Sequence, residues 1–362
     1  MSVSVDSSVS VTATGIPVRN LWHMLLYAWE ETHLIDRWSA EVDSAPSLDA
    51  LLASVLAGMV EQRIRIGLGR DYRDQDELLR GIRGRVDFTR TIRQMALQQG
   101  QVHCHFQIFD ADVPKNRIIR STLLKVAQVA NFGPHRRRAK ELRHRIGRLV
   151  QDLAQIQLIE VKPQTVRRQL ESRDDRDYQI MLRICELLLR RLMPTRETGD
   201  QSLPDLDEDQ MTIYQIFEKF VARFYRQNLK GWSVRPQQHF TWPATEPSAF
   251  LPIMKPDLVL KHRATQKLVI LDTKFTAKSL TNRDRFQTSH LYQLYAYLRS
   301  QEHLGSEYQS ATGVLLYPTV ARELHEQVEI QGHKMFWQTI DLAKPWTQIE
   351  EDLIAIASVW LR

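Results

Sequence analysis

Two carboxylates and one amine stand in an order that suits metal-dependent hydrolysis of a phosphodiester. Asp257 follows a proline, and Asp272 and Lys274 lie at the end of the apolar run Leu268–Phe275. Side chains alternate along a strand, so Asp272 and Lys274 point to one face and only the backbone carbonyl of Thr273 stays near it. Such oxygen ligands suit Mg²⁺, which binds through one or two carboxylates together with water and a phosphate. The pattern predicts a Mg²⁺ site, with Mn²⁺ as an alternative, held by Asp257, Asp272 and the Thr273 carbonyl.

A β-hairpin would bring the two carboxylates together. Phe250–Leu260 and Leu268–Phe275 read as strands joined by a polar turn. Lys274 would then lie against the metal-bound water or the scissile phosphate. An acidic-x-Lys triplet also arises by chance about once or twice in a chain of this length, as Glu160–Lys162 illustrates, so a surface salt bridge is the alternative. The hairpin and the apolar run ahead of Asp272 favour the catalytic interpretation.

A helix expected over Phe286–Arg299 supplies polar side chains from another direction. Gln293 and Tyr297 are four residues apart and therefore share one helical face. Gln293 could hold the metal-bound water or a phosphate oxygen, and Tyr297 could brace it. For the tyrosines of this helix, packing against the sheet is the better interpretation, so Gln293 alone joins the candidate catalytic residues.

These motifs resemble, in the same order, those of the PD-(D/E)xK nuclease superfamily in its RecB-like branch: Pro256-Asp257, Asp272-x-Lys274 and Gln293-x-x-x-Tyr297. Glu218, in the helical run Ile213–Phe220, is similar to the acidic residue that many members carry on the helix before the core sheet. An exposed glutamate beside Lys219 is the alternative for that position. The resemblance implies a restriction-endonuclease-like α/β core whose catalytic residues are Glu218, Asp257, Asp272, Lys274 and Gln293.

The first half of the chain is similar to one family in particular. Ile16–Trp29 closely resembles the opening signature of McrC, the nuclease subunit of the 5-methylcytosine-dependent restriction system, and Gly81–Arg93 and Asn116–Leu123 are similar to later McrC segments. The resemblance implies a subunit that cuts DNA beside McrB, a ring-forming AAA+ GTPase that recognises modified cytosine and translocates DNA. It also implies that the N-terminal half engages the ring and stimulates its hydrolysis. The candidate residues for that contact are Arg19, Asn20, Arg83 and Arg85.

Composition sets the outer limits. A chain of 362 residues is long enough for two domains with separate cores. Its net charge of +6 and its pI near 9.3 favour a polyanionic partner only weakly. Cys104 and Cys185 have no paired spacing, so neither a disulfide framework nor a zinc module is indicated. No apolar run approaches the length needed to cross a bilayer, and we expect a soluble, cytoplasmic protein.

Polar breaks predict the domain order. Residues 1–15 are expected to form a disordered tail, and residues 16–193 a domain of mixed helices and hairpins that engages the partner. Residues 194–209, which are polar and rich in acids, are expected as the linker. Residues 210–362 are expected as the PD-(D/E)xK nuclease domain. The fold class is α/β, in the broad sense that includes α+β, because mixed strands are flanked by helices.

Two segments of the N-terminal half carry many arginines. Tyr72–Arg93 alternates and contains glycines, which is typical of a β-hairpin. After Gly133 a helix is expected with Ile146 and Leu149 in an apolar stripe and with arginines over the remaining surface. Those arginines could contact DNA phosphates or an acidic partner, and a solvated face is the alternative at equal weight.

The function predicted from the sequence is that of a DNA endonuclease subunit that also stimulates a GTPase. Two alternatives stay open: a non-catalytic assembly subunit that activates the ring, and a stand-alone DNA repair nuclease. Retention of Asp257, Asp272 and Lys274 argues against the first, and the similarity in the first half argues against the second. The chain has no Walker-type phosphate loop, so another chain must supply any nucleotide hydrolysis.

Overall fold

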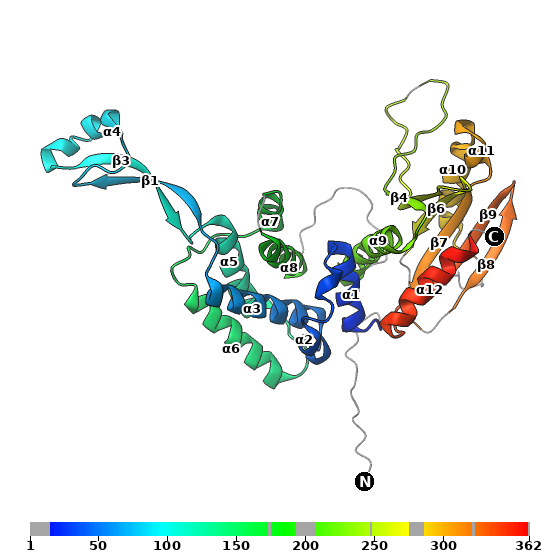
Figure 1. The fold of residues 1–362 in the computed structure, drawn as a ribbon, viewed down its shortest axis with the longest axis horizontal. Coiled ribbons are helices and arrows are strands. Elements are labelled where there is room, and N and C mark those ends of the chain that lie inside the picture. Colours follow the sequence, from blue (N-terminus) through cyan, green and yellow to red (C-terminus); the bar gives the residue numbers. More distant parts are fainter. Residues whose placement is uncertain are drawn as a thin grey trace, which may run out of the picture. The chain divides into compact units, whose positions relative to one another are not determined.

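The computed structural model describes residues 15–172, 175–192, 208–246, 248–274, 286–320 and 323–360. They group into two compact units (Figure 1). The first, here called the sheet unit, combines Met1–Leu48 with Thr198–Arg362, and the second, the helical unit, is Asp49–Glu197. Among the described residues the sheet unit holds a six-stranded sheet and the helical unit a three-stranded one. The mixed α/β character expected from the sequence is confirmed.

The six-stranded sheet is mixed. In spatial order its strands are β4 (Trp232–Pro236), β5 (Leu258–His262), β6 (Leu268–Thr273), β7 (Thr312–Thr319), β9 (His333–Asp341) and β8 (His325–Ile330). β4, β5 and β6 are antiparallel neighbours, β6, β7 and β9 run parallel, and β8 returns antiparallel to β9. β6 is buried along its whole length, and β7 along nearly all of it. Their continuous apolar runs follow from that burial on both faces.

Helix α10 (Thr288–Ser300) packs against the centre of this sheet. Its residues Leu294 and Leu298 share a core with the strands β6 and β7. Gly313 on β7 permits the close approach, because a Cβ at that position would lie 2.9 Å from the Cδ1 atom of Leu298. The apolar core shared with β6 and β7 therefore holds α10, the helix that carries Gln293, on the sheet.

The strand expected over Phe250–Leu260 is shorter in the structure. Only its end, within β5, pairs with neighbouring strands, and ahead of it Met254 forms an isolated bridge with Phe240. Phe250 is almost fully exposed, so it has no sheet face to pack on. The apolar residues in this stretch gave the appearance of a strand, although a proline before Asp257 interrupts the ladder.

Helix α1 (Val18–Trp29) belongs to the sheet unit, which differs from the domain expected over residues 16–193. It packs along α9 (Glu208–Asn228). Asn20 donates its buried amide hydrogens to the carbonyls of Leu342 and Lys344, at 2.8 and 2.9 Å. A helix that is apolar nearly all round must be buried, but its pattern does not say against which part of the chain. The first helix is thus a component of the C-terminal core.

The helical unit is built around five helices. They are α3 (Leu48–Ile66), α5 (Pro114–Val129), α6 (Arg136–Asp152), α7 (Pro163–Leu170) and α8 (Arg176–Leu192). α5 packs on α6 and α8, and α7 packs on α8. Ile146 and Leu149 of α6 are buried, as the expected apolar stripe requires. None of the helices that the structure describes is long and apolar enough to cross a membrane.

A three-stranded sheet, which we call the arm (residues 71–110), extends from these helices within the same unit (Figure 1). β3 (Val102–Asp110) lies between β1 (Asp71–Leu79) and β2 (Arg85–Val86), antiparallel to both. The hairpin expected within Tyr72–Arg93 is therefore wrong in its pairing. Alternation identifies a strand but not its partner, and here both strands pair with a third one further along the chain.

The same segment contains a short helix where strand was expected. Helix α4 (Phe88–Arg93) starts after Asp87, whose side chain accepts a hydrogen bond from the backbone N–H of Arg90. This is an N-cap interaction, and it satisfies a donor that the first turn of a helix leaves free. The aspartate itself, a residue type favoured at the N-cap, was the available signal for this helix.

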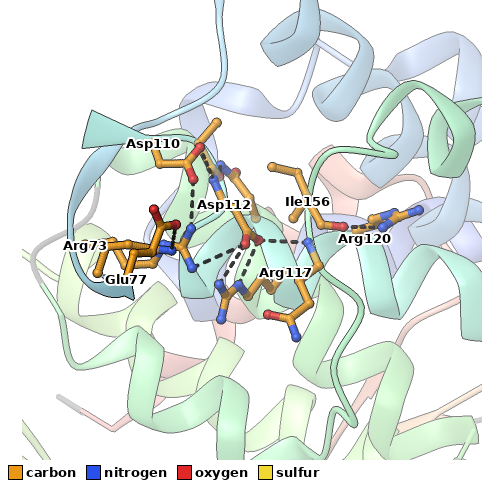
Figure 2. A network of polar contacts seen from close by, with 11 residues as sticks. Arg73, Glu77, Asp110, Asp112, Arg117, Arg120 and Ile156 are labelled. Atoms are coloured by element: carbon orange, nitrogen blue, oxygen red, sulfur yellow. Dashed lines mark hydrogen bonds and ion pairs between the residues drawn. The ribbon is translucent and has the colours of Figure 1, made fainter. Parts of the chain in front are cut away.

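Asp112 ties the arm to the helices (Figure 2). Its carboxylate accepts two hydrogen bonds from the guanidinium of Arg117, at 2.8 and 2.7 Å, and one from the backbone N–H of Gln157 at 2.8 Å. Arg73 on β1 lies 3.9 Å away and also pairs with Asp110 at 3.1 Å. A single carboxylate thus joins the end of β3, the start of α5 and the segment after α6.

We expect the variant Asp112→Asn to lower the free energy of unfolding by about 2 kcal/mol at neutral pH, because it removes charge-assisted hydrogen bonds. The hydrogen bonds from Arg117 hold the pKa of Asp112 below its ordinary value of 3.8. Its contribution is therefore complete above that value and is lost as the pH falls through the lower, folded-state pKa. Urea unfolding of both proteins between pH 2 and 7 measures this pH-dependent difference in the free energy of unfolding. If the variant lost as much stability in acid as the wild type, the prediction would be contradicted.

Candidate active site

The two candidate metal-binding carboxylates are brought together by the hairpin of β5 and β6. Leu258 pairs with Leu271, so Asp257, one residue before β5, lies next to Asp272 of β6. Both are buried, with 8% of Asp257 and 2% of Asp272 exposed. The hairpin predicted from the sequence is confirmed in this respect. Burying an ionised carboxylate to this extent costs free energy unless a cation or a hydrogen-bond donor compensates its charge.

Thr273 contributes more than the expected carbonyl. Its backbone N–H and its hydroxyl both donate to Oδ2 of Asp257, at 2.7 and 2.5 Å. Strand alternation alone predicts that this side chain points away from the site. Asp257 precedes β5, outside the regular ladder, so its carboxylate can reach the Thr273 side of β6. Two hydrogen bonds to one oxygen fix the orientation of that carboxylate, and the Thr273 carbonyl accepts a long one, 3.5 Å, from Tyr214.

Lys274 lies against Asp272. Its backbone N–H donates to the carbonyl of Leu316 at 3.0 Å, which extends the alignment of β6 with β7 by one residue. Its ammonium pairs with Oδ2 of Asp272, and only 15% of the lysine side chain is exposed. No described residue donates a well-aligned hydrogen bond to that oxygen. The lysine therefore provides the main compensation for a buried negative charge.

The electrostatics of the site disfavour ionised carboxylates. Burial raises the pKa of Asp257 well above its ordinary value, and the charges of Asp272 and Glu218 raise it further. Burial also raises the pKa of Asp272, against the opposing charge of Lys274. Bound cations are the largest charges in sites of this kind and favour the ionised carboxylates. The donor set thus fits a divalent metal ion.

The metal would have to be held by two carboxylates and not three. Within the described residues there is no group of three His, Cys, Asp or Glu side chains placed to bind a metal ion. Glu218 on α9 is half-buried, accepts a hydrogen bond from the side chain of Gln237, and acts on Asp257 through its charge. Two carboxylates completed by a carbonyl and water match the preference of Mg²⁺.

Gln293 and Tyr297 form the pair that the helix spacing predicted. The Gln293 amide donates to the Tyr297 hydroxyl at 2.7 Å, and that hydroxyl donates to the carbonyl of Lys255 at 3.2 Å. This chain of contacts ties α10 to the segment just ahead of Asp257. Burial and the charge of Asp272 raise the pKa of Tyr297, which keeps the phenol neutral. Gln293 is therefore close to the site and already fixed at one end of its amide.

Three further residues lie near these side chains and were not predicted from the sequence: His290, Tyr317 and Tyr214. His290, one turn before Gln293 on α10, contacts the hydroxyl of Tyr317 through Nδ1 at 3.0 Å. Burial and the charge of Lys274 lower the pKa of His290 to about 4, so the imidazole is neutral. Tyr214 on α9 completes the set. The spacing of three from Gln293 was a usable signal for His290, whereas the two tyrosines come from remote strands and helices.

The four candidate partner-binding residues have different environments. Asn20 is 3% exposed and donates to two backbone carbonyls, so its side chain holds the fold together in this structure. Arg19 is half-exposed and pairs with Asp43. Arg83 and Arg85 are exposed on the arm, where the Arg83 guanidinium lies 4.2 Å from the centre of the Phe106 ring.

Comparison with known proteins gives consistent similarities. The family described as "McrBC 5-methylcytosine restriction system component" matches residues 5–318. The chain is 27% identical over 354 residues to the "Type IV methyl-directed restriction enzyme EcoKMcrBC" of Escherichia coli (strain K12), covering 96% of this chain and 99% of that protein. Among solved structures, it is similar to a chain of the "half-complex from tetradecameric assembly of Thermococcus gammatolerans McrB AAA+ hexamers with bound McrC". The TM-score is 0.59 at 18% identity, over 95% of this chain and 76% of that one, which shows a shared fold.

Proposed function

The chain belongs to the family of McrBC 5-methylcytosine restriction system components, and from that premise we propose that it is the DNA-cleaving subunit of such a system. The observation that carries the proposal is the buried pair Asp257 and Asp272, facing each other across a hairpin with the Lys274 ammonium against Asp272. Phosphodiester hydrolysis needs negative charge to be neutralised and a nucleophile to be positioned. These three side chains have the chemistry for both.

A bound Mg²⁺ or Mn²⁺ ion would supply an activated water and neutralise the charge that develops on the phosphate. Asp257 and Asp272 would hold the ion, together with the Thr273 carbonyl. The N–H and hydroxyl of Thr273 hold Asp257 in position. Lys274 would donate to the scissile phosphate.

Two more residues of the predicted catalytic set act at the edge of the site. Gln293, fixed by Tyr297, would orient the attacking water or a phosphate oxygen with the free part of its amide. Glu218 would influence the carboxylates by its charge rather than by ligation, because it does not complete a three-residue metal cluster in the described structure.

The proposed partner is a McrB-like AAA+ GTPase ring, and the arm is the proposed contact. Large apolar side chains are exposed over its surface, more than half of each being accessible: Tyr72, Ile82, Phe88, Ile92 and Phe109. An exposed apolar surface of this extent marks an interaction site. Arg83 and Arg85 lie on the same arm and would join the contact. A stand-alone nuclease would leave this surface without a purpose, so the arm favours a subunit that both cuts DNA and stimulates the ring.

The substrate follows from the family: DNA that contains modified cytosine, with recognition of the base assigned to the partner. The test is cleavage of methylated and unmethylated plasmid by this chain with a McrB-like GTPase, GTP and Mg²⁺. We expect cutting only with all components and methylated DNA, and none after chelation of the metal. Stimulated GTP hydrolysis without any cutting would instead favour the non-catalytic assembly subunit.

A further inference from the structure

The basic surplus of the chain is confined to one unit. Asp49–Glu197 contains 29 lysines and arginines against 18 aspartates and glutamates, whereas the rest of the chain has 20 against 25. Within that unit the arm is balanced, with six of each sign over residues 71–110. The helices of the helical unit therefore carry the whole surplus. The modest net charge of +6 is thus the sum of a strongly basic helical unit and a mildly acidic remainder of the chain.

Helix α6 is the most basic of these helices, with seven basic residues and two acidic ones over Arg136–Asp152. Some of them serve the structure of the unit. Arg145 makes a bidentate contact with Glu61 at 2.8 and 2.7 Å, and Arg143 donates to the carbonyl of Ala130 at 2.8 Å. These contacts hold α6 on its neighbours and leave other basic residues of the helix for the outside.

The remaining basic side chains form a stripe. Arg136, Lys140, His144 and Arg148 recur every four residues and all are exposed. Residues four apart lie on one helical face, opposite here to the buried Ile146. Among the described residues none forms a hydrogen bond or ion pair with the side chains of Arg136, Lys140 or Arg148, although the charge of Arg148 acts on Glu61. At 1.5 Å per residue the stripe is about 18 Å long, the axial length of roughly five phosphates on one DNA strand.

We propose that this stripe of α6 binds the phosphate backbone of double-stranded DNA, as a contact separate from the nuclease site. The inference rests on the proposed function in one respect, namely that the chain acts on DNA. Exposed arginine and lysine side chains bind DNA by neutralising phosphates and releasing counterions, independently of base sequence. Such a contact would hold the substrate to the chain while the nuclease site cuts.

An acidic protein surface is the other occupant to consider, and the composition of α6 disfavours it. Protein interfaces are enriched in arginine but also in aromatic side chains, which form their apolar centre, and they are depleted in lysine. None of the large apolar side chains that are exposed in the described structure lies on α6, whereas the arm exposes several and has balanced charge. The chain thus has an apolar contact surface on the arm and a predominantly cationic surface on α6.

The test is a triple substitution that removes the stripe in the full-length chain: Arg136→Gln, Lys140→Gln and Arg148→Gln. Binding to a 30-base-pair unmodified duplex is measured by fluorescence anisotropy over a series of KCl concentrations. Each lost phosphate contact lowers the slope of log K against log salt by about 0.9, so we expect the slope to become shallower by about three. A matched control changes the same charge on exposed residues of the sheet unit: Arg226→Gln, Lys230→Gln and Arg263→Gln.

Several results would overturn the proposal: no DNA binding by the wild type, an unchanged slope in the α6 triple variant, or an equal change in the control. Loss of stimulated GTP hydrolysis with the slope intact would assign the stripe to the protein partner and would also overturn it. Thermal unfolding confirms that both variants fold, since all six side chains are exposed. A chain that binds DNA through α6 but never cuts would refute the proposed function and leave this inference standing.

Discussion

Replacing Asp272 by alanine should lower the single-turnover rate of DNA cleavage by at least about a thousandfold. The change removes one of two buried carboxylates and the partner of Lys274. The metal ion contributes several kcal/mol to stabilisation of the transition state, and each 1.36 kcal/mol is tenfold in rate. Because the Asp272 site lies in the sheet unit and the arm in the helical unit, stimulation of GTP hydrolysis by the partner should remain.

The chain supplies a matched control for this variant. Glu160 and Lys162 repeat the acidic-x-Lys spacing, but they are exposed and form a surface ion pair at 3.3 Å. Glu160→Ala should therefore cut DNA at the wild-type rate. Asp272→Asn serves as a second nuclease variant, because it keeps the shape of the side chain and leaves Lys274 a polar neighbour. If clean Asp272→Ala protein cut at even a tenth of the wild-type rate, the metal site would have to lie elsewhere.

A second readout separates metal binding from catalysis. Mg²⁺, or Ca²⁺ as an inert substitute, should raise the melting temperature of the wild type and of Glu160→Ala, because a ligand that binds only the folded state stabilises it. The same ions should have no effect on Asp272→Ala. A shift of equal size in all three proteins would assign the metal to another site, even if cleavage were lost.

The parts of the site that were predictable depend on local patterns. The apolar run that ends in Asp272 marks a buried strand, and a polar turn ahead of it marks a hairpin, so the pairing of β5 with β6 beside Asp257 and Asp272 was predictable. Gln293 and Tyr297 were linked by helical spacing alone, and their hydrogen bond has that geometry. In each case the interacting residues lie in one element or in two adjacent ones.

What could not be predicted depends on contacts between remote segments. The hydroxyl of Thr273 faces Asp257 because that carboxylate lies outside the ladder, which strand alternation does not anticipate. Asn20 is a polar residue that follows an arginine near the start of a helix, a position that suggests exposure. Its side chain instead donates to carbonyls more than 300 positions away in the sequence. A periodic pattern states that a face is buried, and only tertiary structure states what covers it.

The arm shows the same limit and yields the second large effect. Gly84 precedes β2 with φ of +65°, a left-handed backbone conformation that costs other residues about 1–3 kcal/mol. A Cβ there would also lie 2.4 Å from the carbonyl oxygen of His105, a contact that only a shift of the backbone can relieve. β2 pairs with β3 through Arg85 and Val86, and just beyond them the backbone N–H of Asp87 donates to the carbonyl of His103 at 2.8 Å. Gly84→Ala should therefore detach β2, with Arg85, from the arm.

We expect Gly84→Ala to reduce stimulation of the partner's GTP hydrolysis at least tenfold while the Mg²⁺-induced rise in melting temperature remains. Gly81→Ala is the matched control, since a Cβ at that position meets nothing within 4 Å and should leave stimulation unchanged. Faster hydrogen exchange over β2 and β3 would confirm that only the first variant disturbs the arm. If Gly84→Ala protein stimulated GTP hydrolysis fully although its arm showed faster hydrogen exchange, the arm would be excluded as the contact with the ring. Loss of stimulation in both variants would point instead to the loop before β2, whose Gly81 carbonyl accepts from the thiol of Cys104.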